Sequence, residues 1–225
     1  MARTISCSNP CAGSKGGTLD PVVSHQRTLP RNYGGLPLVS ACRCRVMTRS
    51  YPSFYYFPRT KSAPPWVEHV LDVFESARGS IDTRKAPHKT SNQVLRILRP
   101  GLQKIGFEVE SGPRQNQKLH RPVYFTEMGI ADVKYEIDAF HPQHGIVVEV
   151  EAGRSVMGNA IYRDIVRMSL MIDARCAVIA VPIEYKFGKK RTLNKAYEIT
   201  VSAMNAIWSS ERLRLPFEGM LLVGY

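Results

Sequence analysis

Residues 135–154 read YEIDAFHPQHGIVVEVEAGR, and this stretch decides the fold because it places four acids in two predicted strands. Residues 146–150 are branched apolar side chains interrupted only by Glu149, a pattern typical of a buried strand. Glu136 and Asp138 come before the predicted loop, and Glu149 and Glu151 come after it. Carboxylates in buried strands lose hydration and repel one another, so a cation is expected to accompany them.

The spacing of these acids makes a sharp structural prediction. Side chains alternate across a strand, so Glu149 shares a face with Glu151, and Asp138 shares a face with Glu136. If paired residue numbers sum to an odd value, Asp138 and Glu149 lie on one face of an antiparallel pair. If Asp138 opposes Glu149 directly, Glu136 opposes Glu151 and four carboxylates form one patch. A hard divalent cation relieves such repulsion through oxygen ligands.

The rest of the chain predicts alternating helices and strands. Pro64 and Pro65 begin a helix that Gly79 ends, and Thr90 or Ser91 caps a second helix that ends at Gly106. Within this second helix, Pro100 is expected to bend or break it. Further expected elements are strands at 107–110, 121–125 and 176–181, helices at 155–172 and 193–208, and an edge strand at 220–223. A crossover helix between strands 146–150 and 176–181 predicts that these two are parallel neighbours.

The order helix, three strands, helix, strand resembles the PD-(D/E)xK nuclease superfamily, whose fold is restriction-endonuclease-like. The parts that carry the resemblance are EIDAF, VVEVEAGR, the helix after them and CAVIAVP, within residues 90–182. The resemblance implies an α/β fold in αβββαβ order, with a mixed central sheet flanked by helices. It also implies that Asp138 and Glu149 bind Mg²⁺ or Mn²⁺, with Glu151 as a further ligand or as the base that orients water.

The chain departs from that family's pattern in two places. The motif is D-x10-E-x-E, so Glu151 stands where the family usually has Lys. The predicted helix 90–105 contains no Asp or Glu, although that helix often donates an acid in the family. The sequence therefore leaves open what replaces the lysine and which further acid belongs to the site.

The first 60 residues differ from the remainder in composition and charge. Frequent Pro and Gly break any periodic pattern, which predicts a disordered basic tail over residues 1–60 and one domain over residues 64–225. An alternative is that the natural protein begins at Met47. Residues 1–64 hold nine Lys or Arg against one acid, a net charge of +8, whereas the rest holds 22 against 18, which is +4. Zinc binding is a minor alternative to free thiols for four cysteines of this segment, Cys7, Cys11, Cys42 and Cys44.

No apolar stretch is long enough to span a membrane, and the first 20 residues lack the apolar core of a secretory signal. The five cysteines are not the pattern of a secreted disulfide scaffold, so we expect a cytoplasmic protein without membrane contact. Its expected partner is DNA, because a basic body around local acids suits an enzyme that meets a polyanion. The sequence leaves a homodimer open.

Basic side chains near the acids are candidates for phosphate or DNA contacts. They are Arg154, Arg163 and Arg167, together with Lys189 and Lys190 of the KFGKKR stretch. Arg163 and Arg167 could instead pair with the acids, or lie on a solvated helix face. His141 and His144 could bind a metal, but the adjacent Pro142 and Gly145 favour ordinary loop histidines.

We therefore predict a Mg²⁺-dependent endonuclease that hydrolyses DNA phosphodiester bonds. One alternative is a catalytically inactive nucleic-acid-binding protein of the same fold. A second is an interaction module whose acidic face meets a basic partner. A purely structural alternative for the strand acids is a solvated strand face whose negative charge is balanced by Arg154 or Lys134.

Overall fold

A six-stranded mixed sheet forms the centre of the protein in the computed structural model, which describes residues 50–152, 159–187, 192–210 and 212–225. Two neighbouring interior strands, β7 (Cys176–Val181) and β10 (Gly219–Gly224), have every residue buried, as expected of strands covered on both faces. In sheet order the strands are β1 (Ser53–Phe57), β10 (Gly219–Gly224), β7 (Cys176–Val181), β6 (Ile146–Val150), β5 (Ala139–His141) and β2 (Glu108–Val109).

The predicted parallel pairing of β6 with β7 is confirmed, and β10 extends this parallel set on the other side of β7. The outer strands β1, β5 and β2 run antiparallel to their neighbours. The carboxyl ends of β6, β7 and β10 therefore meet at one edge of the sheet, where Glu149 and Glu151 are located.

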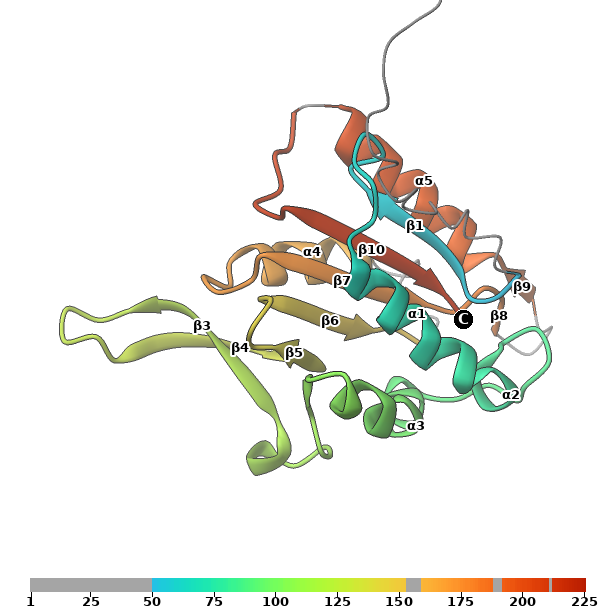
Figure 1. Cartoon of the computed structure of the whole chain (residues 1–225), viewed down its shortest axis with the longest axis horizontal. Coiled ribbons are helices and arrows are strands. Elements are labelled where there is room, and N and C mark those ends of the chain that lie inside the picture. The colour runs from blue at the N-terminus through green and yellow to red at the C-terminus, as the bar shows by residue number, and fades with distance from the viewer. Residues whose placement is uncertain (1–49, 153–158, 188–191, 211) are drawn as a thin grey trace, which may run out of the picture. The chain divides into compact units, whose positions relative to one another are not determined.

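Helices cover both faces of the sheet (Figure 1). On one face Leu71 and Leu98 pack in one core cluster with Val148, and on the other Ile165 and Met204 pack in a second cluster with Val147. The first face carries α1 (Pro65–Ser76) and α3 (Ser91–Lys104), with the short α2 (Arg78–Ile81) after α1; the second carries α4 (Ala160–Ser169) and α5 (Ala196–Ser209).

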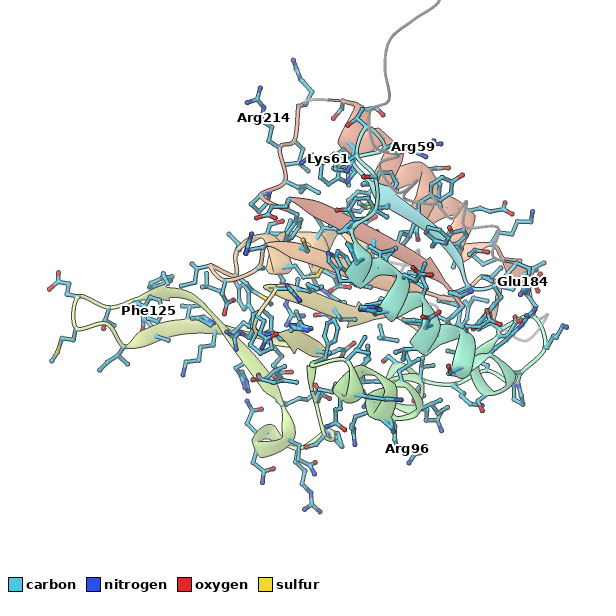
Figure 2. All side chains as sticks on the ribbon, in the orientation of Figure 1. Arg59, Lys61, Arg96, Phe125, Glu184 and Arg214 are labelled. Carbon is cyan, nitrogen blue, oxygen red and sulfur yellow. The ribbon has the colours of Figure 1, made fainter. Side chains whose placement is uncertain are left out.

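Two hairpins stand outside the central sheet. The longer one, which we call the arm, pairs β3 (Leu119–Phe125) with β4 (Ala131–Ile137) after a 3₁₀ turn, η1 (Gln115–Gln117). The arm projects away from the sheet, and Phe125 lies far along it (Figures 1 and 2). The shorter one pairs β8 (Tyr185–Phe187) with β9 (Thr192–Asn194).

The predicted boundary at residues 60–64 is wrong. β1 lies within the segment expected to be disordered, and it pairs over its full length with β10. Tyr51 and Phe57 are 1% and 0% exposed, so this segment is part of the hydrophobic core. Its strand-forming sequence is SFYYF, whose aromatic residues favour a sheet although Pro52 and Pro58 flank it. Residues 1–49, including the four cysteines considered for zinc, lie outside the described residues.

Other expected elements need smaller corrections. Helix α1 ends at Ser76, before Gly79, which lies in α2. Pro100 lies inside α3 and does not break it. The next residue, Gly101, has no side chain, which allows α3 to pack closely against Val73 of α1. Residues 220–223 belong to β10, which is an interior strand, because β1 takes the edge position. Thr90 caps α3 and Gly106 follows its end with a positive φ, as predicted. Across the described ranges, none of the helices is long and apolar enough to cross a membrane.

Candidate active site

The register of β5 and β6 decides where the predicted acids lie. The pairs Ala139 with Val148, Phe140 with Val147 and His141 with Ile146 all sum to 287, an odd number. This register, continued by one residue, sets Asp138 opposite Glu149 on the face that α4 covers. The Asp138 carboxylate is also fixed there, since its Oδ2 accepts a hydrogen bond of 2.7 Å from the backbone N–H of Val150. The predicted odd-sum register is confirmed.

The predicted patch of four strand acids is wrong, because the chain leaves the sheet at Asp138. β4 pairs with β3 of the arm, and Glu136 stands opposite His120 instead of Glu151. The far edge of β5 is taken by β2, and the Glu110 N–H donates to the Asp138 carbonyl at 2.9 Å. Glu136 is 41% exposed, so it is not buried as Asp138 and Glu149 are.

Two further acids, which the predicted site did not include, lie near these carboxyls. Asp164 of α4 is 1% exposed and Glu110, directly after β2, is 4% exposed. Asp164 had a signal in the sequence, because it occupies a position on the apolar side of α4 with Ile161, Ile165 and Met168. Buried acids on an apolar helix face are uncommon and point to a site. Glu110 had no comparable signal, since it ends a short alternating strand.

Glu151 follows β6 and is held at both its backbone and its side chain. Its N–H donates to the Ala180 carbonyl at 2.8 Å, and its own carbonyl accepts a hydrogen bond of 2.6 Å from the Tyr225 hydroxyl. Arg163 lies 3.7 Å from its Oε1 and 3.1 Å from Asp164 Oδ1. The other oxygen of Asp164, Oδ2, is buried without an amide, ammonium or hydroxyl donor. A proton on Glu151 supplies such a donor, so these two carboxyls share a hydrogen bond when Glu151 is protonated.

Cations from two elements surround the acids. Lys118, just before β3, lies 2.9 Å from one oxygen of Glu110 and 3.0 Å from the other. Arg167 of α4 donates to the Glu136 carbonyl at 3.1 Å, and its charge acts on Glu149. Of the alternatives predicted for these two arginines, pairing with the acids is what the structure shows for Arg163, whereas Arg167 contacts the backbone of Glu136. Arg163 is 61% exposed and remains accessible to a substrate.

Burial and mutual repulsion shift the acids toward their protonated forms. Burial raises the pKa of Asp138 to about 7, and burial and then the charge of Asp138 raise the pKa of Glu149 well above its usual value. Burial and the hydrogen bond with Asp164 raise the pKa of Glu151 to about 8. Burial alone would lower the pKa of Lys118, but the hydrogen bond to Glu110 and the charges of nearby acids together raise it, so Lys118 stays cationic. Perturbed carboxyls grouped in this way are typical of functional sites.

The acid cluster, defined as Glu110, Asp138, Glu149, Glu151 and Asp164, carries more negative than positive charge once its carboxyls ionise. Three cations, Lys118, Arg163 and Arg167, interact with it. If all five carboxyls ionise, an excess of two negative charges remains among these groups. The alternative of a solvated strand face does not describe Asp138, Glu149 and Glu151, because burial is the largest cause of the raised pKa of each.

The other predicted contacts do not join the cluster in the described residues. His141 is not a loop residue: it ends β5, is 7% exposed and packs against Phe107 and His144 on the opposite side of the sheet from the acids. Arg154, Lys189 and Lys190 lie outside the described residues. A polar pocket of about 280 Å³ opens beside Glu151, lined by His88, Thr90, Ser91, Glu151, Ala152 and Tyr185.

Comparison with known proteins now decides the family. Residues 45–225 match the family described as "Putative halobacteria restriction endonuclease", which is most of the chain and contains the whole sheet. The chain belongs to this family. No curated protein and no solved structure matches it. Membership in the halobacterial restriction endonuclease family indicates a nuclease, and the mixed α/β sheet with helices on both faces is compatible with that.

Whether the site of this restriction endonuclease family member fits a metal depends on the type, the placement and the charge of its side chains. Within the ranges that the structure describes, no three His, Cys, Asp or Glu side chains already stand in a metal-binding arrangement. The chemistry nevertheless suits a hard divalent cation, because all candidate ligands are carboxylate oxygens and their charge excess is two. Asp164 Oδ2 is also buried without an ordinary donor. The side chains therefore fit such a cation in chemical type and in charge. In the described residues their oxygen atoms do not already surround one common position.

The raised pKa values predict how stability depends on pH in this restriction endonuclease family member. Asp138, Glu149 and Glu151 bind protons more tightly in the folded state than in the unfolded chain, so the folded state holds more protons at neutral pH. The free energy of unfolding should therefore fall as the pH rises from about 6.5 to 8. His141, with its lowered pKa, acts in the opposite direction only below about pH 6.5.

Urea denaturation in the presence of a chelator measures this dependence. The Asp138→Asn variant should show a shallower slope over the same interval, since one of the titrating groups is gone. A metal-free protein whose stability stays level or rises from pH 6.5 to 8 would show that these carboxyls titrate normally.

Proposed function

We propose that this protein is a cytoplasmic, Mg²⁺- or Mn²⁺-dependent endonuclease that hydrolyses phosphodiester bonds of DNA. The observation that carries the proposal is the acid cluster: Asp138 and Glu149 share one face of adjacent strands, in a chain of a restriction endonuclease family. We further propose that α3, β2, β5, β6, α4 and β7 form the αβββαβ core of a PD-(D/E)xK nuclease. In that interpretation the arm is an insertion between the first two core strands.

In this proposal Asp138 and Glu149 hold the divalent cation. The cation, when bound, neutralises excess negative charge and lowers the pKa of a water molecule. The chain's own groups have separate tasks. The Val150 N–H orients the Asp138 carboxylate through the 2.7 Å hydrogen bond, and the backbone contacts of Glu151 hold its side chain at the end of β6.

Glu151 serves as the general base in this mechanism. Water attacks the phosphorus, its proton passes to the Glu151 carboxylate, and the phosphorus–oxygen bond to the leaving group breaks. The leaving oxygen takes a proton from solvent. A pKa of about 8 suits this role, since a base is most effective when its pKa is near the working pH. Asp164 then accepts a hydrogen bond from the protonated Glu151. Arg163, exposed beside both acids, is available for a neighbouring phosphate.

Thermal melting with and without metal tests the metal part of the proposal. Ca²⁺, Mg²⁺ or Mn²⁺ at tenfold its dissociation constant should stabilise the folded state by about 1.4 kcal/mol. For a chain of this size the melting temperature should then rise by roughly 3 to 6 °C. Asp138→Asn should remove most of this rise.

Incubation with plasmid DNA and divalent metals tests the activity. The wild-type protein should cut DNA with Mg²⁺ or Mn²⁺, whereas Ca²⁺ should support binding with little cleavage. Salt-sensitive DNA binding without cleavage under any metal would favour the inactive DNA-binding alternative. A protein that neither binds DNA nor melts higher with metal would favour the interaction module.

A further inference from the structure

Lys118 is a cation that the fold holds near Asp138, since its charge acts on that carboxyl. Its ammonium group contacts both oxygens of Glu110, at 2.9 and 3.0 Å, and Glu110 is 4% exposed. The Glu110 N–H donates in turn to the carbonyl of Asp138 at 2.9 Å. Lys118 is thus tied, through one residue, to the backbone of a proposed metal ligand on a neighbouring strand.

The contacts of Lys118 leave part of its hydrogen-bonding capacity unused. An ammonium group has three N–H donors, and the two oxygens of Glu110 engage at most two of them. Glu136 Oε2 lies 3.8 Å away, beyond hydrogen-bond distance. The Lys118 side chain keeps 20% of its surface exposed, so a molecule at the acid cluster can reach it.

The other two cations of the cluster differ from Lys118 in their partners. Arg167 donates to the backbone carbonyl of Glu136 and lies over the ring of Tyr135. Arg163 is 61% exposed, lies at the Glu151 and Asp164 end, and pairs there with both carboxyls. Both arginines come from α4, whereas Lys118 comes from the base of the arm, and its charge acts on Asp138.

A phosphodiester that enters the acid cluster brings further negative charge beside its five carboxyls. A fixed cation with a free donor compensates this charge where it is greatest, on the non-bridging oxygens of the phosphate. Because Glu110 orients the ammonium group before substrate arrives, little reorganisation is needed when charge develops during the reaction.

We propose that Lys118 contacts the phosphate that is cut, donating a hydrogen bond to a non-bridging oxygen, and that Glu110 is the positioning residue that holds it. This inference rests on the proposed nuclease function. Lys118 acts as a permanently charged donor and exchanges no proton with the substrate. The cation that contacts the phosphate thus comes from the residue just before β3. At its carboxyl end, β6 contributes Glu149 and is followed by Glu151, which are both acids.

Single-turnover cleavage of a DNA duplex, with Mg²⁺ or Mn²⁺, tests this role. Lys118→Gln alone leaves Glu110 buried without its cation and risks misfolding, so the main variant is Lys118→Gln with Glu110→Gln. Two amides can still hydrogen-bond in the same space, and thermal melting checks that the fold is kept. The double variant should cleave at least about 100-fold more slowly, the loss typical for one transition-state donor. Its affinity for duplex in Ca²⁺ should change less than about threefold, which a loss of structure would not allow.

Three matched variants complete the experiment. Lys118→Arg keeps the charge and should cleave faster than the double variant. Glu110→Gln keeps Lys118 but loosens it, so the cleavage rate should fall while the KM stays level. Lys85→Gln removes one exposed lysine elsewhere and should leave cleavage unchanged. Cleavage at the wild-type rate by the double variant would disprove the role of Lys118 and would leave the proposed nuclease function standing. A wild-type protein that cuts no DNA with any divalent metal would overturn the nuclease function and this inference with it.

Discussion

Replacing Asp138 by Asn or Glu149 by Gln should lower DNA cleavage at least about 1,000-fold, a loss of about 4 kcal/mol in transition-state stabilisation. Each change removes one ligand charge while keeping the shape of the side chain. In Asp138→Asn the new amide oxygen can still accept the hydrogen bond from the Val150 N–H, so the local structure should persist. Quantified cleavage in Mg²⁺ and in Mn²⁺ measures the effect.

The same two variants should be at least as stable as the wild-type protein without metal. Asp138, directly before β5, lies close enough to Glu149 of β6 for their charges to repel, and the raised pKa of each follows from burial first and then from nearby acids. Loss of activity together with equal or higher melting temperature is what a functional carboxylate pair predicts. Glu127→Gln, an exposed acid in the turn of the arm, is the matched control and should change neither property. Variants that melt lower and still cut DNA would mean that the pair is structural.

Removing residues 1–60 should abolish folding, whereas removing residues 1–46 should shift the melting temperature by no more than a degree or two. The longer deletion takes away β1 together with Tyr51 and Phe57, both fully buried. Each large core side chain contributes about 3 to 5 kcal/mol, against a total stability of about 5 to 15 kcal/mol. It also turns β10 into an exposed apolar edge, which favours aggregation.

Circular dichroism melting and solubility of the two truncated chains distinguish these outcomes. Phe57→Ala in the full chain is the finer control and should cost about 3 to 5 kcal/mol of unfolding free energy. A soluble, cooperatively melting protein that lacks residues 1–60 would show that β1 is dispensable. A large loss on removing only residues 1–46 would show that the earlier segment contributes to the fold.

Local patterns predicted much of the sheet and part of the site. The apolar runs of β6 and β7 and the helix between them suffice to predict a parallel pair, and the number of residues between Asp138 and Glu149 permits the shared face. These features depend on alternation and on connection rules, which act over short stretches of chain.

Features that depend on distant partners were not predictable in the same way. β1 is stabilised by pairing with β10, at the other end of the chain. The prolines on both sides of β1 made its sequence resemble a disordered segment. The departure of β4 at Asp138 depends on β2 taking the edge of β5, which no local pattern encodes. Glu110 and Lys118 became site residues only through that arrangement. Asp164 was the exception, because an acid among apolar helix positions is visible in the sequence.

The separation of the arm from the central sheet has an evolutionary consequence. Asp138 is fixed by the β5–β6 register and by Val150, and neither depends on the outer part of the arm, where Phe125 and Met128 lie exposed. Residues 123–133 can therefore lengthen, shorten or change composition among descendants of this gene while the acids keep their alignment. Selection can act on the contacts of the arm and on the chemistry of the acids as two largely independent traits.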